Sequence, residues 1–302
     1  MSGEEGTLFR VSRPGMPWDS WLYGTLHAGL GGRPPRWRDL LACLTNVDRV
    51  ALELAPDVTL KPQQLPGPKL RDVVEPEEVR RVEETLAVFA PAWTGVDSAV
   101  VALLALSAAL WTVPGSSVDR SIEDRARALC LPLVGLETLS EQLEALAEAT
   151  PDELRRCIRA QLVAIDAPEA TRVALAQDLI ARYRRGWLAE LLDGFRAALP
   201  QMTQHLVDTR NERLARRFGA LALEGPTLGA IGALHLAGPR GVVAQLATDG
   251  WTVSVAPCPC VAWMSGVGTM MPSPNRDGQP AIGRSGRPAG PIGRTPFPSG
   301  SG

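Results

Sequence analysis

The chain has 302 residues, which is enough to bury a sizeable hydrophobic core, and its composition is that of a globular protein. Its 31 lysines and arginines nearly balance its 33 aspartates and glutamates, so the formal net charge is only −2. A balance this even predicts no steering toward nucleic acid or anionic lipid, and we expect no nucleic-acid partner.

The sequence predicts neither a secretory signal peptide nor a membrane span. The opening MSGEEGTLFRV carries two early acids and no apolar run, which does not fit a secretory signal peptide. The longest apolar stretch, Ala99 to Val113, is shorter than a bilayer requires and contains Ser107, which favours a buried helix. We therefore expect a cytoplasmic protein with no membrane span.

The sequence predicts β-strands in the first part of the chain, between residues 8 and 54. Leu8 to Ser12 and Ser20 to Leu26 are short apolar runs separated by the loop-forming RPGMPWD, a pattern typical of a β-hairpin. A further strand is predicted at Asp48 to Leu54, where apolar residues alternate. Glu53 falls on the less apolar face of that strand.

Helical signals dominate from about residue 75 to residue 218, interrupted by a predicted strand at Leu131 to Leu136. Pro76, followed by two glutamates, indicates a helix start, because its fixed φ suits the first turn and acids favour the helix dipole there. Further helices are predicted to begin near Ser121, Leu139, Pro151, Ala167 and Gln201. We interpret this region as a large helical insertion over a sheet.

The chain then returns to a strand, helix, strand pattern, with strands at Leu228 to Leu236 and Trp251 to Ala256 and a helix from Pro239. From Ser265 onward glycine, proline, serine and arginine replace apolar periodicity, which predicts disorder. The sequence thus predicts a mixed α/β fold in one domain over residues 1–262, with a disordered Gly/Pro-rich tail over 263–302.

Two of the three histidines share one local pattern: Gly24-Thr25-Leu26-His27 and Gly232-Ala233-Leu234-His235. Each histidine is predicted to end an apolar strand, where loops gather and sites form. Two such histidines are also compatible with structural side chains that are hydrogen-bonded in the core. The residues alone leave both interpretations open.

Charged side chains near the ends of the predicted strands are further candidates. Glu53 and Glu137 follow apolar segments, and two neutral imidazoles with one carboxylate form a common open metal site. Arg210, by contrast, begins an i, i+3, i+7 arginine row on a predicted helix. Such a row usually forms a solvated face, here pairing with Asp208 and Glu212.

Four segments, in the same order, resemble those of the TraB/GumN (Tiki-like) family. They are LFRVSRPGMPWDSWLYGTLHAG at the start, LPLVGLETLSEQ at residues 131–142, LVDTRNERLA at residues 206–215, and GAIGALHLAGPRGVVAQLATDGWTV at residues 229–253. Together they span about Leu8 to Pro257. Four ordered motifs are far more specific than a single GxxH.

The resemblance implies a fold related to erythromycin-esterase-like and ChaN-like proteins, in which a central mixed sheet of two related halves carries one GxxH in each half. It also implies a divalent metal ion, because Tiki proteins are described as metal-dependent proteases. The positions that match the family's motifs are His27, His235, Glu53, Glu137 and the pair Arg210 and Asn211.

The resemblance therefore predicts a metal-dependent hydrolase, most simply a peptidase, acting on a peptide or small-molecule substrate. His27 and His235 would bind manganese, cobalt or zinc with one carboxylate, and the other carboxylate would accept a proton from the bound water. Which of Glu53 and Glu137 has which role stays open. Arg210 would hold a substrate carboxylate or the developing oxyanion.

Three other functions remain as alternatives. The same activated water would attack a small ester, which makes the protein an esterase. The site could instead bind metal, haem or a peptide without turnover, as in a regulatory protein. The helical region could also serve a purely structural interaction. Homodimers are the commonest symmetric assembly, and this general preference is the sole ground for expecting one here.

Overall fold

The computed structural model describes residues 7–27, 30, 32–56, 67–110 and 117–256. The predicted tail at residues 263–302 lies outside the described residues, as does the end of the long apolar stretch at residues 111–113.

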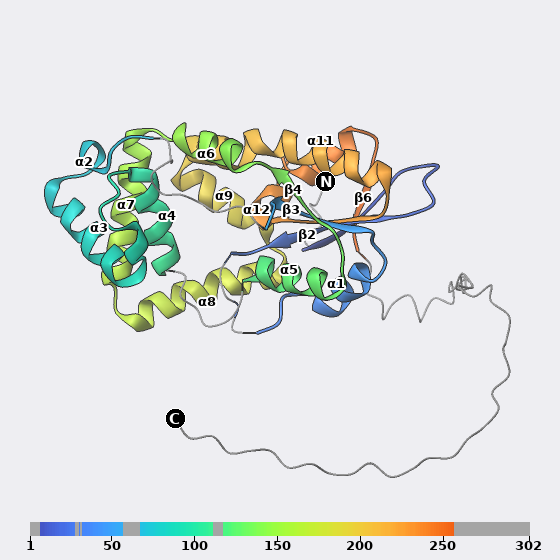
Figure 1. Cartoon of the computed structure of the whole chain (residues 1–302), viewed down its shortest axis with the longest axis horizontal. Helices are drawn as coiled ribbons and strands as arrows, with labels where there is room; N and C mark the ends of the chain where they lie inside the picture. The colour runs from blue at the N-terminus through green and yellow to red at the C-terminus, as the bar shows by residue number, and fades with distance from the viewer. Residues whose placement is uncertain (1–6, 28–29, 31, 57–66, 111–116, 257–302) are drawn as a thin grey trace, which may run out of the picture. The chain divides into compact units, whose positions relative to one another are not determined.

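The described chain forms a six-stranded mixed sheet with helices on both faces, which confirms the predicted fold class (Figure 1). The strand order is β4-β3-β5-β2-β1-β6, in which the first four strands run parallel and β1 is antiparallel to both of its neighbours. The strands are β1 (Leu8–Ser12), β2 (Ser20–Thr25), β3 (Arg49–Leu54), β4 (Leu133–Glu137), β5 (Thr227–Gly232) and β6 (Thr252–Val255).

Both faces of the central strands are covered, as parallel strands require. Val50 and Ala51 are adjacent on β3, point to opposite faces, and are both fully buried. The face of β3 that carries Ala51 and Glu53 is therefore also covered, like the opposite face that the sequence predicted to be apolar. Figure 1 shows α11 and α6 on one side of the sheet and α1 and α5 on the other. Their bounds are α1 (Trp37–Leu44), α5 (Val118–Ala128), α6 (Leu139–Ala147) and α11 (Thr209–Glu224).

The remaining helices extend the sheet core and build a second one. Two of them, α8 and α9, bring Tyr183 and Leu192 into the sheet core. The second core lies among the other helices, with Val82, Leu106 and Ile158 at its centre. No helix in the described residues is long and apolar enough to cross a membrane. The bounds are α2 (Leu70–Val73), α3 (Pro76–Phe89), η2 (Pro91–Trp93), α4 (Ala99–Leu110), α7 (Pro151–Asp166), α8 (Glu169–Arg185), α9 (Leu188–Ala198) and α10 (Pro200–Thr203).

Local sequence signals explain most helix starts. Each predicted helix in the middle region begins within three residues of its expected position. Thr138 and Thr150 cap α6 and α7, because each side-chain oxygen accepts a hydrogen bond from the backbone N–H three residues on. Helix α3 begins at Pro76, as its fixed φ predicts.

The segment after β5 differs from the prediction. The expected strand to Leu236 ends at Gly232, and one helical turn, α12 (Ala233–Leu236), follows. The helix expected from Pro239 begins later, as α13 (Val242–Thr248). Gly238 has φ +76°, a left-handed turn that separates the two helices, and Pro239 lies in this turn. His235 is consequently on a helical turn rather than at the end of a strand.

One glycine of β5 allows the sheet to meet α11. A Cβ atom added at Gly229 would lie 2.8 Å from both Leu22 Cδ2 and Phe218 Cδ2. We predict that Gly229→Ala lowers the free energy of unfolding by about 1–3 kcal/mol through overpacking. Urea denaturation measures this change in the free energy of unfolding. The matched control is Gly194→Ala at an exposed position of α9, where a Cβ meets nothing within 4 Å; it is expected to be neutral or stabilising. Equal effects of the two substitutions would contradict this packing.

Candidate functional site

The candidate residues gather where parallel strands end. The carboxyl ends of β2, β3, β4 and β5 lie at one edge of the sheet, with Thr25 paired to Gly232 and Leu54 paired to Glu137. Glu53, Glu137 and the two motif histidines therefore reach the same edge, although they are distant in sequence. Figure 1 shows α12 and the ends of β2, β3 and β4 close together there.

Glu137 is clamped by two arginines of α11. Its Oε2 accepts hydrogen bonds from Nε (2.9 Å) and Nη2 (2.6 Å) of Arg210. Its Oε1 accepts from Nε (3.1 Å) and Nη2 (2.5 Å) of Arg213. The Glu137 side chain is fully buried. A buried carboxylate that accepts four charge-assisted hydrogen bonds has no lone pair left for a metal ion or a substrate proton.

Arg210 joins Glu137 to Glu53. Its Nη2 donates to Glu53 Oε2 at 2.7 Å, and its Nη1 donates to the carbonyl oxygen of Leu206 at 3.0 Å. Burial lowers the pKa of Arg210, but the two carboxylates outweigh burial and raise it above its ordinary value. The solvated arginine face expected from the i, i+3, i+7 spacing is wrong for Arg210, whose side chain is 10% exposed and pairs with strand-end acids.

The rest of the row continues the ion-pair network. Arg217 donates to both carboxylate oxygens of Glu141, at 2.7 and 2.8 Å, and to the carbonyl oxygen of Leu136 at 2.7 Å. The arginine spacing in the sequence indicated Arg217, but nothing in the sequence indicated that Glu141 and Leu136 are its partners. Gln142 also donates to Glu53 Oε2, at 3.4 Å.

Glu53 is held as an anion. Besides Arg210, the backbone N–H of Gly232 donates to its Oε1 at 2.6 Å. Burial raises the pKa of Glu53, but the imidazole of His235 when protonated, the Arg210 guanidinium and the Gly232 N–H together lower it to about 2. A Cβ at Gly232 would lie 2.8 Å from Glu53 Oε1, so the glycine of the second GxxH allows this contact.

His235 is buried and oriented by Asn211. The His235 Nδ1 and Asn211 Oδ1 atoms are 2.7 Å apart, and Asn211 Nδ2 donates to the carbonyl oxygen of Arg240 at 2.9 Å. Since Asn211 already donates through its nitrogen, its oxygen must accept, and the ring proton is on Nδ1. Burial lowers the pKa of His235 to about 4. The ring is therefore neutral at neutral pH, with the Nε2 lone pair free.

The free Nε2 of His235 lies 4.0 Å from Glu53 Oε1. Both atoms are hydrogen-bond acceptors, and their separation is too long for a hydrogen bond. A cation of the right size would interact favourably with both. Imidazole nitrogen and carboxylate oxygen are ordinary ligands of divalent transition metals.

His27 follows β2 and faces the start of α5, where its Nδ1 lies 3.0 Å from Asp119 Oδ2. The charge of Asp119 raises the pKa of His27. The His27 side chain is 76% exposed, so solvent screens this attraction. Nothing in the sequence pointed to Asp119, which is 92 positions away.

The six predicted residues thus form one connected set plus one outlying histidine. Glu53, Glu137, Arg210, Asn211 and His235 are linked by contacts across four elements, whereas His27 approaches from β2 with a separate partner. Within the described ranges, no group of three or more His, Cys, Asp or Glu side chains is close enough to hold a metal ion. His235 Nε2 and Glu53 Oε1 are the two candidate atoms that face each other.

The sequence matches the TraB/PrgY/gumN family over residues 7–255, which is most of the chain. The chain belongs to this family, and the resemblance identified from four motifs is confirmed at that level. No curated protein matches the chain.

Removal of the central guanidinium tests the buried network. We predict that Arg210→Met lowers the free energy of unfolding by about 3–5 kcal/mol, because Glu53 and Glu137 then lose a shared buried counter-ion. Denaturation by urea at neutral pH gives the value. Arg216→Met on the exposed face of the same helix is the control, expected within about 0.5 kcal/mol of wild type. A loss below about 1 kcal/mol for Arg210→Met would mean that the network contributes little.

The Glu141–Arg217 pair predicts a pH dependence. Hydrogen bonds from Arg217 lower the pKa of Glu141 to about 2, from 4.5 in an unfolded chain. The stabilisation is therefore fully present above about pH 4.5 and is lost as the pH falls toward 2. We expect the difference in unfolding free energy between wild type and Glu141→Gln to shrink on acidification from pH 6 to about pH 3. A difference that is constant with pH would contradict the pairing.

Proposed function

We propose that the protein is a metal-dependent hydrolase whose ion is bound by Nε2 of His235, Oε1 of Glu53 and Nε2 of His27. One observation carries the proposal. Both GxxH histidines have Nδ1 engaged by an acceptor side chain, Asn211 for His235 and Asp119 for His27, and neither Nε2 has a hydrogen bond among the described residues.

This arrangement is what metal-binding histidines require. Such a histidine almost always donates its second ring N–H to a carboxylate or carbonyl oxygen, which fixes the tautomer and the ring orientation. Asn211 and Asp119 supply these acceptors on two different elements, α11 and α5. A buried ring nitrogen usually has a hydrogen-bond partner, so the Nε2 of buried His235, which has none among the described residues, supports metal binding, whereas water can bond to Nε2 of the exposed His27.

Glu53 suits the role of ligand better than that of base. A general base works best with a pKa near the operating pH, whereas the pKa of Glu53 is lowered to about 2. Its Oε2 is occupied by Arg210 and its Oε1 faces His235. We therefore assign Glu53 as the anionic ligand. Arg210 is a positioning residue that acts through Glu53, with only one N–H of its guanidinium not hydrogen-bonded among the described residues.

Glu137 then acts as the counter-ion that fixes Arg210 and Arg213. With four hydrogen bonds from these arginines, it is neither ligand nor base in this proposal. A bound manganese, cobalt or zinc ion would acidify water and polarise a carbonyl group, which serves hydrolysis of a peptide or of a small ester. We take the peptide bond as the first substrate class. The complete ligand set requires His27 to approach the other two ligands more closely than in the present structure.

A second candidate is a regulatory protein that binds metal, haem or a peptide without turnover. The observation that favours it is the full pairing of Glu137, which leaves no described strand-end carboxylate free to accept a proton from water. The two candidates share the metal-binding histidines and differ in turnover.

The test measures metal binding and hydrolysis separately. Purified protein is titrated with manganese, cobalt and zinc by calorimetry, and a peptide and ester library is assayed with each ion. We predict metal-dependent turnover that is lost in His235→Ala and His27→Ala. In Asn211→Ala the metal affinity should fall by about 10- to 100-fold, because the His235 ring is no longer oriented.

His205→Ala is the matched control, since His205 pairs with Glu148 outside the site and its loss should leave binding and turnover intact. Circular dichroism checks that all variants fold. Metal binding without turnover would support the regulatory protein. No binding of any ion by the folded wild type would refute both candidates.

A further inference from the structure

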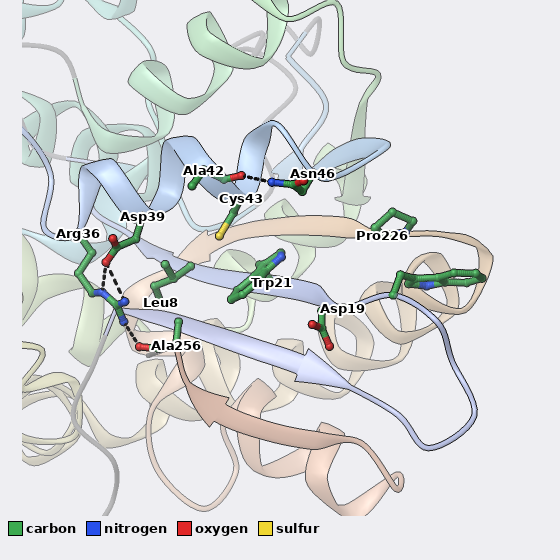
Figure 2. A pocket seen from close by; sticks show the side chains of 11 residues that line it. Leu8, Asp19, Trp21, Arg36, Asp39, Ala42, Cys43, Asn46, Pro226 and Ala256 are labelled. Atoms are coloured by element: carbon green, nitrogen blue, oxygen red, sulfur yellow. Dashed lines mark hydrogen bonds and ion pairs between the residues drawn. The ribbon is translucent and has the colours of Figure 1, made fainter. Parts of the chain in front are cut away.

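A cavity lies between α1 and the sheet, beside the beginning of β2. Its volume is about 410 Å³, within the range of small-molecule sites. It is bounded by the beginning of β2, Leu8 of β1, the inner face of α1, and the residues Pro226 before β5 and Ala256 after β6 (Figure 2). None of the six candidate site residues lines it.

The floor of the cavity is aromatic and apolar. Trp21 and Leu8 rise from the sheet beneath α1, and Cys43 points down from that helix toward them (Figure 2). Trp18 also lines the cavity, and its indole N–H donates to the carbonyl oxygen of Ala222 at 3.0 Å, which fixes the ring. Two indoles in one small cavity favour a flat apolar body, and their faces also attract cations.

The polar atoms of the cavity are mainly acceptors. Asp39 is bound through Oδ2 by Arg36 at 2.8 Å, and Asp19 pairs through Oδ2 with Arg10 at 2.8 Å. Asn46 uses its nitrogen in bonds to Ala42 and Thr45. The other side-chain oxygens of Asp19, Asp39 and Asn46 have no hydrogen bond among the described residues. Three open acceptors call for a ligand that carries N–H donors.

The charge of the cavity lining also favours a ligand with cationic N–H donors. Of the described residues that line the cavity, Asp19 and Asp39 are acidic and Arg36 is the one cation, so the described part of the lining is net negative. Arg10 pairs with Asp19 from outside the lining, and its side chain is 47% exposed, so this ion pair is weak. An anionic ligand would meet repulsion and open acceptors, whereas an ammonium or amidinium group would meet attraction and hydrogen bonds.

We propose that this cavity binds a small organic cation with a flat apolar body, of the arylalkylamine type. The ring lies against Trp21 and Trp18, and the ammonium group donates to the open carboxylate oxygen of Asp19. The site is separate from the metal-binding residues, so its occupancy would provide either a second ligand site or a means of regulation. It does not depend on the hydrolase proposal.

The test uses phenethylamine as the probe, with 2-phenylethanol and phenylacetate as neutral and anionic analogues of the same size. Saturation-transfer NMR and calorimetry on the full chain measure binding. Phenethylamine should bind with a dissociation constant of about 1 mM or lower and at least about tenfold more tightly than the alcohol, a factor that corresponds to about 1.4 kcal/mol.

Variants locate the bound probe. Asp19→Asn should abolish the preference for the amine over the alcohol, and Trp21→Phe should weaken both. Asp249→Asn, which removes the same charge at an exposed position outside the lining, should change neither. The proposal is overturned if amine and alcohol bind equally to wild type, if no binding is seen at about 10 mM, or if Asp19→Asn behaves like Asp249→Asn.

Discussion

The site depends on one buried ion-pair network, the guanidinium of Arg210 between the carboxylates of Glu53 and Glu137. Burial of two carboxylates is unfavourable unless a counter-ion and hydrogen bonds compensate it, and α11 supplies both. This requirement ties the helix to the ends of β3 and β4. It also explains why the largely buried Glu53 stays ionised. The guanidinium of Arg210 is in turn hydrogen-bonded to these two carboxylates.

The network also determines which groups are free to act. Both carboxylate oxygens of Glu137 accept hydrogen bonds from Arg210 and Arg213, whereas Oε1 of Glu53 faces His235. On the same helix, the residue after Arg210 is Asn211, which orients the ring of His235. Adjacent positions of α11 therefore hold Glu53 and His235, the two groups proposed as ligands. Because an α-helix turns by about 100° per residue, neighbouring side chains can address different strands at the same sheet edge.

Much of this could be predicted from the sequence. Apolar alternation and proline positions located the hairpin, β3, β4 and most helix starts, because these features are local. The repeated GxxH identified both histidines. What sequence reasoning missed depends on tertiary contacts. The i, i+3, i+7 spacing suggested that Arg210 faces solvent, and the acids that pair with it are 73 and 157 positions away in the sequence. Asp119 offered no signal, and the helical turn that carries His235 was hidden in an apolar run typical of a strand.

The most direct test of the account is the tautomer of His235, read from nitrogen-15 NMR of its imidazole at neutral pH before and after addition of zinc. The account predicts a neutral ring with the proton on Nδ1, and a zinc-dependent shift confined mainly to Nε2. A proton on Nε2, a charged ring, or a spectrum that zinc leaves unchanged would contradict the assignment of His235 as a metal ligand.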